Sequence, residues 1–590
     1  MDAEDLEPLY TPQENILEEC LRREAERVAH QENLMNRVVY DGVDAAPTKL
    51  KEEDVAAAQE ETKGQGAQGQ DGGELEEGAA ATKLAAAAAS GTTEAGAENG
   101  GEVVSDCDND TQMTPYYQPS FKNDHTLVFE SRFESGNLRR AIQVYEFEYD
   151  LILKPDYNTR GFTQWYYFRV SNTCAGRTYR FNIINLLKPD SLYNHGMRPL
   201  MYSEIEAKTN GKGWVRAGRD VCYYQNSMKR KTAGHYYTLT FRAQFQHDND
   251  TVYFAHSYPY TYSDLQRYLN RLEEDPKKKQ RMKRRELCKT IAGNACDLLI
   301  VTTFGSDYEE VRRRKGLVIS SRVHPGETGA SFMMKGIIDY LVGPSLGARM
   351  LRDNFVIKIV PMVNPDGVIN GNTRCSLSGC DLNRVWIDPS PKLHPTVYHL
   401  KALIKQMQAE RDLFLFCDLH GHSRKKNMFM YGNCNKNETQ VKEKIFPFLL
   451  EKAADIFNFA DCAFAVQKSK ESTARVVGWK ELGITNCYTL ESTFCGSDFG
   501  KYQDLHFNTN MLQSIGPKFC ETILEYNFLD ATRQKQILEE IEESANRIKE
   551  EPQGNPMMGM GGQIEDEAVA GLLSVDNAGL LGIIKDEESC

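Results

Sequence analysis

The composition of the chain changes abruptly at Tyr116, and this boundary constrains its folding more than any other feature of the sequence. From Asp41 to Pro115 there is no Phe, Tyr, Trp or Ile, and Ala, Gly, Glu and Gln dominate. Such a segment cannot bury enough apolar surface to offset the conformational entropy that ordering would cost. We therefore expect residues 1–115 to form an acidic, largely disordered N-terminal region, with a marginal helix between Leu6 and Met35.

Residues 116–262 have the pattern of an antiparallel β-domain. Short runs rich in Tyr, Phe, Val and Thr recur between turn residues, among them AIQVYEFEYDLIL, QWYYFRVSN and YYTLTFRAQF. Many short strands at this spacing are typical of a sandwich, with a barrel-like sheet as the alternative. We expect an antiparallel β-sandwich domain here.

In residues 263–530 strands alternate with helices. A charged helical stretch comes first, is broken at Pro276 and includes the run KKKQRMKRR. Buried strand patterns such as GLVISSRV and LFLFCDLH then alternate with amphipathic helix patterns such as PTVYHLKALIKQMQAER. This alternation predicts an α/β layer fold with a largely buried sheet. Residues 531–590 have the composition of a polar helix followed by a disordered, acidic tail.

The overall composition of the 590 residues excludes several classes of protein. The longest apolar runs are far shorter than the roughly 18 residues of a membrane span, and the acidic first residues are unlike a signal peptide. The fifteen cysteines form no CxxC pair, which favours reduced thiols in the cytoplasm. The formal net charge of −14 argues against nucleic acid as a partner. We expect a soluble, intracellular protein with no membrane partner.

The first candidate for chemistry is the motif His324-Pro-Gly-Glu327, which follows the strand pattern GLVISSRV directly. Strand ends are where α/β folds place their sites, and an imidazole and a carboxylate across a tight turn can face one ion. Alone the motif is weak, because about one such spacing is expected by chance in a chain of this composition. A solvent-facing loop is the alternative interpretation.

A third metal ligand is available at the end of another predicted strand. His420 ends LFLFCDLH and is followed by Gly421. Catalytic zinc sites commonly combine a close pair of ligands with one distant ligand. His422 competes with His420 for this role, but we interpret His422 as a neighbouring histidine that does not bind the metal.

Three polar groups and a late glutamate complete the candidate set. Arg374, Asn383 and Arg384 lie in a turn-rich segment, and arginine with a neighbouring amide suits a carboxylate-binding pocket. The alternative is a polar loop whose arginines pair with local acids such as Asp381. Glu491 ends the strand-like NCYTLE and has the chemistry of a general base that activates water.

Taken in order, HPGE, GNTR, DLNR, the strand-terminal histidine and YTLES resemble the zinc metallocarboxypeptidases, specifically their cytosolic carboxypeptidase subfamily. The resemblance extends to FESGNL, QWYYFRVSN and YPYTYSDL in the β-domain and covers about 400 residues. Segments such as RCSLSGCDLNR and ARVVGWKELGITNCYTLESTF are most similar to the second and third mammalian types. The resemblance implies a metallocarboxypeptidase α/β/α sandwich with a mixed sheet in residues 263–530.

The resemblance also implies a role for each candidate residue. One zinc ion per chain would be held by His324, Glu327 and His420. Arg374 would stabilise the oxyanion of the scissile carbonyl, and Glu491 would move the proton from the attacking water to the leaving amine. The substrate's C-terminal carboxylate would be bound by the pair Asn383 and Arg384. One departure is that no Tyr lies between Asn433 and Cys487, where digestive relatives carry a mobile tyrosine, so Tyr488 or another group takes its place or no cap is needed.

The substrate class follows from the resemblance with some support from the residues. Members of the subfamily remove glutamates from acidic C-terminal tails and polyglutamate side chains, with tubulin as the main target. The segment that would face the departing side chain contains Arg475 and Lys480, whereas an apolar pocket would avoid buried cations. The basic runs KKKQRMKRR, RRRK and RKK could attract an acidic tail, although charge runs are more often solvated faces. RKK follows His420 closely and is favoured among the three.

Two other functions remain open from the sequence. A relative that acts on small N-acyl amino acids would share the His-x-x-Glu motif and the distant histidine, but not DLNR or the β-domain. A non-catalytic protein that grips acidic tails of microtubules would not require Glu491. The expected location is the cytoplasm, with microtubules, centrioles or cilia as the places that the family association suggests.

Overall fold

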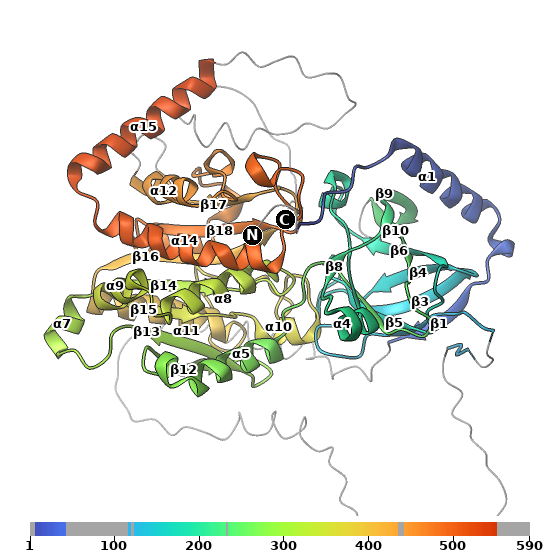
Figure 1. Cartoon of the computed structure of the whole chain (residues 1–590), viewed down its shortest axis with the longest axis horizontal. Coiled ribbons are helices and arrows are strands. Elements are labelled where there is room, and N and C mark those ends of the chain that lie inside the picture. Colours follow the sequence, from blue (N-terminus) through green and yellow to red (C-terminus); the bar gives the residue numbers. More distant parts are fainter. Residues whose placement is uncertain (1–5, 43–115, 120–122, 232–233, 435–441, 551–590) are drawn as a thin grey trace, which may run out of the picture.

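The computed structural model describes residues 6–42, 116–119, 123–231, 234–434 and 442–550. Two domains lie side by side in Figure 1, a β-domain and a larger α/β domain. The sequence predictions of disorder for residues 43–115 and 551–590 lie outside the described residues.

The β-domain is a sandwich of two sheets. One sheet has the order β1-β3-β4-β6-β10-β9 and the other the order β2-β5-β11-β7-β8. The bounds of its elements are α1 Glu14–Ala29, β1 Arg37–Asp41, β2 Val128–Glu130, β3 Leu138–Tyr145, β4 Glu148–Leu153, β5 Tyr167–Ser171, β6 Thr178–Leu186, β7 Leu200–Ser203, α4 Glu204–Asn210, β8 Val215–Arg216, β9 Arg219–Lys229, β10 His235–Gln244 and β11 Val252–Ala255. The pairing is antiparallel as predicted, except that β4 and β6 are parallel.

Alternating side chains explain why these strands form a sandwich. Phe168, Phe181 and Phe254 come from both sheets and are fully buried in one aromatic core between them. The residues beside Phe168 are only partly buried on the opposite face of β5, which is the period of two expected for a sheet, whereas those beside Phe181 on β6 are buried, and one of them, Arg180, contacts Cys20 of α1. The predicted sandwich is therefore confirmed and the barrel alternative is not.

The N-terminal residues are more ordered than the sequence predicts. The segment between Leu6 and Met35 contains α1, a helix of 16 residues that packs on β9 through Ile16 and Cys20. Strand β1 then pairs with β3 at the edge of the larger sheet. Residues 6–42 thus belong to the β-domain. Helix α1 would be marginal in isolation, but packing on a sheet that is distant in the sequence stabilises it.

The α/β domain is built on a seven-stranded mixed sheet of order β12-β13-β15-β14-β16-β18-β17. Strands β15, β14, β16 and β18 are parallel at its centre. The bounds of the elements are α5 Tyr262–Glu274, α6 Pro276–Lys279, β12 Met282–Lys289, β13 Ala295–Val301, α7 Tyr308–Arg313, β14 Lys315–Ser321, α8 Gly329–Leu341, α9 Leu346–Asn354, β15 Phe355–Val360, α10 Pro365–Asn370, α11 Pro395–Glu410, β16 Leu413–His422, β17 Met428–Tyr431, α12 Ile445–Ala453, α13 Ala474–Lys480, β18 Cys487–Thr493, α14 Thr509–Asn527 and α15 Ala531–Glu550.

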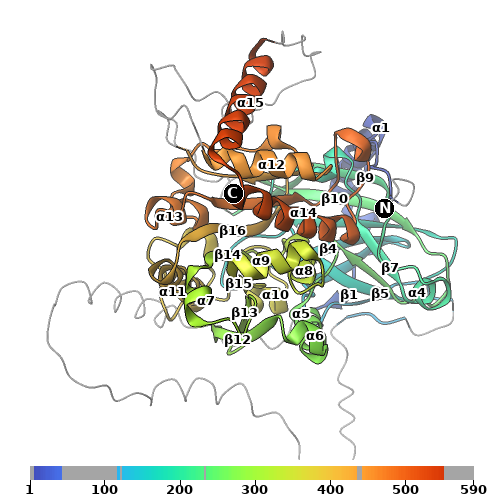
Figure 2. The ribbon, with the colours of Figure 1, turned by 60° about the vertical axis from the view of Figure 1, so that its left-hand side comes forward.

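Helices cover both faces of this sheet. Leu317 and Ile319 of β14 face a core formed with α5, α8, α9, α12 and α14, whereas Val318 faces a second core formed with α11 and α13. The result is the predicted α/β/α sandwich with a mixed sheet. Helix α15 extends away from the body of the domain, as Figure 2 shows.

One predicted helix is a strand. The charged stretch after Tyr262 is helical only as far as Lys279, and residues Met282–Lys289 form β12 at the edge of the sheet. This strand pairs antiparallel with β13, so a partner in the sheet overrides the helical propensity of its charged residues. Long charged side chains are typical of edge strands, where they discourage pairing with another chain.

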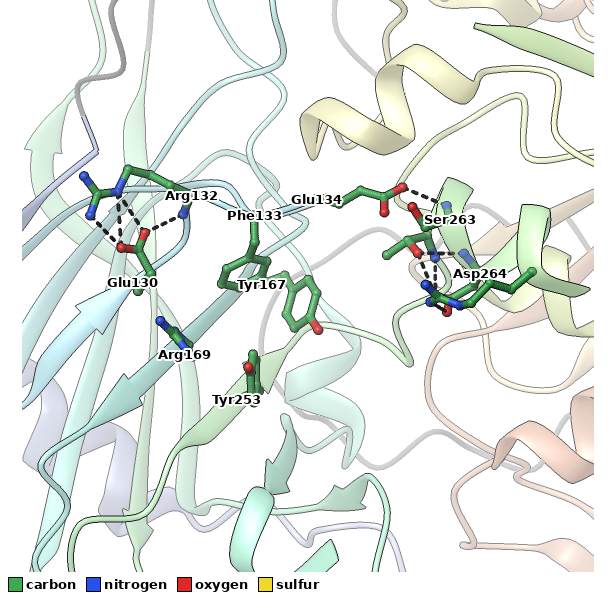
Figure 3. A pocket seen from close by; sticks show the side chains of 11 residues that line it. Glu130, Arg132, Phe133, Glu134, Tyr167, Arg169, Tyr253, Ser263 and Asp264 are labelled. Carbon is green, nitrogen blue, oxygen red and sulfur yellow. Dashed lines mark hydrogen bonds and ion pairs between the residues drawn. The ribbon is translucent and has the colours of Figure 1, made fainter. Parts of the chain in front are cut away.

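An open pocket of about 590 Å³ lies between the two domains, where the outer face of the five-stranded sheet meets α5. Figure 3 shows the rings of Phe133, Tyr167 and Tyr253 on one side and Ser263 and Asp264 on the other. None of the predicted site residues lines this pocket. In the described part of the chain no helix combines the length and apolar character that crossing a membrane needs.

Candidate metal centre and active site

The three predicted metal ligands meet at the carboxyl end of the parallel strands. His324 and Glu327 lie on the turn between β14 and α8, and His420 lies near the end of the neighbouring strand β16. Their ligand atoms are all within 4.8 Å of one another. The prediction that a close pair and a distant histidine come together is therefore confirmed.

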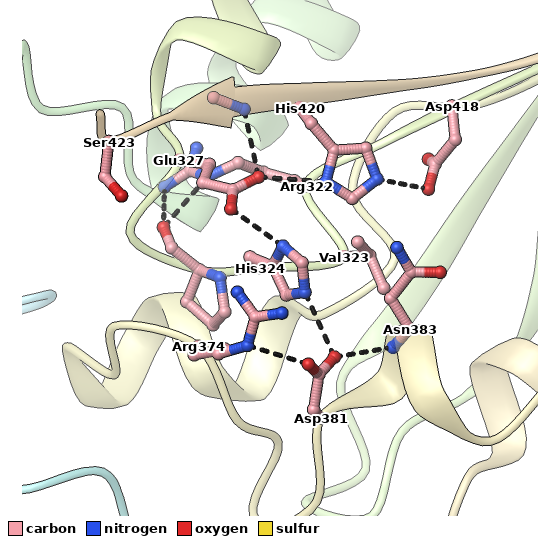
Figure 4. A network of polar contacts seen from close by, with 12 residues as sticks. Arg322, Val323, His324, Glu327, Arg374, Asp381, Asn383, Asp418, His420 and Ser423 are labelled. Atoms are coloured by element: carbon pink, nitrogen blue, oxygen red, sulfur yellow. Dashed lines mark hydrogen bonds and ion pairs between the residues drawn. The ribbon is translucent and has the colours of Figure 1, made fainter. Parts of the chain in front are cut away.

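Glu327 lies between the two imidazoles, as Figure 4 shows. Its Oε1 is 2.8 Å from Nδ1 of His324, and its Oε2 is 3.0 Å from Nδ1 of His420. The backbone N–H of Gly421 also donates to Oε2, at 3.0 Å. The two Nδ1 atoms and the carboxylate thus converge on one point.

Two further carboxylates hold the outer sides of the imidazoles. Nε2 of His324 is 3.0 Å from Oδ1 of Asp381, and Nε2 of His420 is 2.7 Å from Oδ2 of Asp418. Carboxylates in this position fix the tautomer and orientation of metal-binding histidines and make them stronger ligands. Sequence reasoning missed Asp418, although its place two residues before His420 puts it on the same face of the strand.

This arrangement fits a zinc ion. With Nε2–H directed at an aspartate, each histidine presents the lone pair of Nδ1 to the centre, where Glu327 adds oxygen. Two imidazole nitrogens and one carboxylate are a common ligand set of catalytic zinc. Burial raises the pKa of Glu327, but His324 and His420 outweigh it and hold that pKa well below its ordinary value, so the carboxyl is ionised.

The turn that carries His324 is held from behind by Arg322. Its guanidinium donates twice to the carbonyl of Pro325, at 3.0 and 2.7 Å, and also to Tyr260 O and Ser331 Oγ. Burial lowers the pKa of Arg322 to about 9, so it is still charged at neutral pH. Arg322 itself has a φ of 59°, a conformation that side chains with Cβ seldom adopt. No pattern in the sequence indicates this role.

Glu491 lies beside the cluster on strand β18, directly opposite His420 in the parallel pairing. It is 8% exposed, and its Oε2 is buried without a hydrogen-bond partner in the described structure. Burial raises the pKa of the carboxyl to about 7. A buried carboxyl whose pKa lies near neutrality is suited to accepting and releasing a proton.

The predicted carboxylate-binding residues lie next to the cluster around Asp381. Arg374 Nε donates to Asp381 Oδ2 at 2.7 Å, and Asn383 N donates to Oδ1 at 2.8 Å. Arg384 Nη1 lies 3.8 Å from Oδ2 of the same carboxylate. The alternative interpretation, in which the arginines pair with Asp381, thus describes real contacts, but these contacts also bring the arginines to the ligand His324. The amide oxygen of Asn383 accepts from Ala474 N, which leaves its amide NH₂ as the donating group.

The two predicted specificity cations have different surroundings. Arg475 is 6% exposed, and its Nη1 donates to Asn433 Oδ1 at 2.6 Å and to Gly432 O. Lys480, at the other end of α13, is exposed and forms an ion pair with Glu471 at 2.7 Å. Helix α13 packs against Cys487 on the face of β18 that also carries Glu491, so the buried Arg475 lies on the Glu491 side of the sheet, whereas Lys480 is exposed to solvent.

Two other candidates are resolved by their contacts. His422 is not in the metal cluster, because its Nδ1 accepts backbone N–H bonds from Arg424 and Lys425. Tyr488 cannot cap a substrate, because it is fully buried on the opposite face of β18 from Glu491, where its hydroxyl donates to Glu443 O. Strand alternation in the sequence already contained this information.

The three basic runs lie in different parts of the α/β domain. KKKQRMKRR runs from α6 into β12, the edge strand, which is separated from β14 by two strands, and RRRK lies at the amino end of β14, opposite the cluster. RKK, residues 424–426, lies on the connection that follows β16, beside His420. Only RKK is therefore next to the site.

Two family models match the chain. The zinc carboxypeptidase model covers residues 265–543, and the cytosolic carboxypeptidase N-terminal domain covers residues 129–257. Cytosolic carboxypeptidase 3 of Bos taurus is 48% identical over 74% of this chain and 44% of its own length. Cytosolic carboxypeptidase 2 of Mus musculus is 48% identical over 71% of this chain and 49% of its length.

The matching region is shared by several types of relative. Cytosolic carboxypeptidase 1 of Homo sapiens is 47% identical over 72% of this chain, so identity does not choose among the types. The chain spans less than half the length of these relatives. A metallo-carboxypeptidase structure from Burkholderia cenocepacia is 22% identical and superposes with a TM-score of 0.56 over 68% of this chain and 98% of that one, which shows the shared fold.

Proposed function

The chain belongs to the cytosolic carboxypeptidase family of zinc carboxypeptidases, and from this premise we propose that it is a zinc-dependent metallocarboxypeptidase. We propose that it removes glutamates from the C-terminal or side-chain polyglutamate tails of tubulin and other acidic proteins. The observation that carries the catalytic part is Glu491, a buried carboxyl with an unpartnered oxygen beside three converging metal ligands. Binding alone would not require such a base.

His324, Glu327 and His420 would hold the zinc, with Asp381 and Asp418 orienting the two imidazoles. A zinc ion at this point supplies Lewis acidity, which polarises a carbonyl and makes water easier to deprotonate. Everything else in the reaction falls to side chains of the chain itself.

Glu491 would take a proton from the attacking water and pass it to the leaving amine. Its pKa of about 7 places it where both transfers are accessible at neutral pH. Arg374, held by Asp381, would neutralise the negative charge that develops on the scissile carbonyl oxygen. The amide of Asn383 and the guanidinium of Arg384 would bind the C-terminal carboxylate, so that only a terminal residue reaches Glu491.

Arg475 supports a glutamate as the residue removed. Its guanidinium is buried, and among the described residues no carboxylate forms an ion pair with it. Burial lowers its pKa to about 10, so it is a cation at neutral pH. Among the described residues its guanidinium donates to the neutral oxygens of Asn433 and Gly432 and lies 5.9 Å from the centre of the Tyr431 ring. A buried cation without a paired carboxylate is costly, and a ligand that brings one would offset that cost. The side chain of a glutamate brings such a carboxylate.

Two variants, each of which removes one cation of helix α13, test this assignment. We expect Arg475→Met to lower kcat/KM for a glutamate-terminated peptide about 100-fold, or roughly 3 kcal/mol, because one partner of a buried pair is lost. Lys480→Met is the matched control, since it removes a cation from the same helix that is exposed and paired with Glu471. Equal losses in the two variants would show that Arg475 does not recognise the side chain.

The tail beyond the cleaved residue would meet the RKK segment. Arg424 is exposed beside the site and forms no ion pair with the described residues. A polyglutamate tail has the complementary charge, and attraction of this kind chiefly raises the association rate and weakens with salt. We place the protein accordingly in the cytoplasm, at microtubules, centrioles or cilia, where such tails are displayed.

A non-catalytic protein that grips acidic tails is the second candidate, favoured by the same basic groups at RKK and Arg475. Glu491→Gln separates the two functions. The enzyme would lose turnover and still bind a polyglutamate peptide, whereas the binding protein would show no zinc-dependent turnover in the wild type.

A further inference from the structure

A carboxylate of the β-domain binds the loop that carries Arg374. Asp156, three residues after β4, is 2% exposed. It accepts the backbone N–H groups of three consecutive residues of the α/β domain: Thr373 at 2.5 Å, Arg374 at 2.7 Å and Cys375 at 2.7 Å. No single bond in this set involves a side chain of the loop.

Contacts on both sides of this loop continue the connection. Thr373 Oγ1 accepts the backbone N–H of Trp165 at 3.0 Å, again from the β-domain. The carbonyl of Thr373 accepts the N–H of Gly326 at 2.8 Å, within the turn that carries the metal ligands. A Cβ at Gly326 would lie 2.9 Å from this carbonyl oxygen, so the close approach requires glycine. The loop is thus packed between Asp156 and the ligand turn.

Three backbone N–H groups that converge on one carboxylate fix the local backbone, and with it the direction in which each side chain projects. The middle residue of the three is Arg374. Toward the far end of its side chain, Nε donates a hydrogen bond to Asp381 at 2.7 Å. Asp156 holds the base of this side chain and Asp381 holds its tip. Burial raises the pKa of Asp156 to about 6, which leaves it ionised, as an acceptor only, at neutral pH.

We propose that Asp156 is a positioning residue for the reaction, which orients Arg374 from the β-domain and makes that domain part of the catalytic unit. The inference rests on the proposed function, since it requires that Arg374 meets the substrate. The β-domain then contributes to catalysis, because the α/β domain alone lacks the carboxylate that holds the Arg374 loop.

The metal ligands have a separate anchor. The carbonyl of Pro325, inside the ligand turn, is bound twice by Arg322 of the α/β domain itself. Loosening the Arg374 loop should therefore leave zinc binding intact and affect the chemical step. This separation distinguishes positioning from a general loss of structure.

The test is Asp156→Asn in the whole chain, which keeps the size of the side chain but replaces one acceptor oxygen with a donor. We expect kcat on a polyglutamate peptide to fall about 10- to 100-fold, as misplacement of a catalytic group does, with KM within about threefold and zinc content unchanged. Asp250→Asn is the matched control, because Asp250 is also 2% exposed in the β-domain but binds Ser203 and Ile205. Equal losses of kcat in both variants, or none in Asp156→Asn, would overturn the proposal.

A double-mutant cycle tests the route through Arg374. If Asp156 acts by orienting Arg374, then Asp156→Asn should cost less than about threefold in an Arg374→Ala background. A full 10- to 100-fold loss in that background would contradict the proposal. Should Asp156→Asn fail to fold, Thr373→Val removes the acceptor for Trp165 and serves in the same cycle.

Hydrogen exchange separates this inference from the proposed function. If the wild type releases no amino acid from any peptide, the proposed function fails, and exchange of the amides of residues 373–375 still decides the clamp. Faster exchange there in Asp156→Asn than in Asp250→Asn supports the clamp, and equal exchange rejects it.

Discussion

Asp418 provides a sharp prediction about metal affinity. It is 1% exposed, lies 2.7 Å from Nε2 of His420 and accepts a second hydrogen bond from Ser320 Oγ at 2.6 Å. Asp418→Asn keeps the volume but replaces the carboxylate with a neutral amide, which weakens the hydrogen bond to His420 and makes its imidazole a poorer ligand. Loss of such a partner typically lowers zinc affinity 10- to 100-fold, or about 1.4–2.8 kcal/mol.

The assay is zinc stoichiometry after equilibration with graded zinc buffers, which does not depend on turnover. Asp366→Asn is the control, because Asp366 is also buried in the α/β domain but binds Thr290, Ala292 and Asn294 instead of a metal ligand. Affinity in folded Asp418→Asn within twofold of the wild type would refute the argument that this carboxylate tunes the ligand. Equal weakening in Asp366→Asn would show that any buried charge in the domain matters.

Three more predictions concern the same site. Removing zinc with a chelator should lower the melting temperature by several degrees and zinc alone should restore it, since a ligand that binds the folded state stabilises it; an unchanged melting curve would contradict the metal site. Arg322→Lys should lose zinc affinity about tenfold, because one ammonium cannot reproduce two bonds to Pro325 and those to Tyr260 and Ser331; wild-type affinity would contradict its anchoring role. Because the Glu491 carboxylate must be ionised to accept a proton, kcat/KM should fall as the pH drops through its pKa, which burial raises to about 7; a kcat/KM that stays constant as the pH drops through this value would contradict the assignment.

The layers of the fold and the metal ligands were accessible from the sequence because their signals are local. HPGE comes just after a buried strand, and His420 lies near the end of the neighbouring strand in the sheet. A parallel sheet brings such strand ends together whatever the loops between them do. Strand alternation would likewise have placed Asp418 on the same face as His420, and Tyr488 on the face of its strand opposite Glu491.

Other parts depend on contacts between distant segments, and no local pattern reports them. Strand β1 pairs with β3 across the whole segment that follows it, and β12 is a strand only because β13 lies beside it. Asp156 is 218 residues from the amide of Arg374 that it binds. Its own sequence context, a turn after a strand, predicts a surface aspartate.

The orientation of Arg475 was also beyond the sequence. Both Arg475 and Lys480 lie on the short helix α13, where periodicity alone does not say which side faces the sheet. The structure buries Arg475 against Gly432 and Asn433 and leaves Lys480 with Glu471. Only the packing of this helix distinguishes the two cations.

The most direct test of the account is release of free glutamate from a peptide that ends in several glutamates, by zinc-loaded protein and by Glu491→Gln, beside a matched peptide that ends in leucine. We expect release from the glutamate peptide alone and its loss in Glu491→Gln. Equal release from the leucine peptide would contradict the recognition by Arg475, and zinc-dependent release that survives in Glu491→Gln would contradict the catalytic assignment.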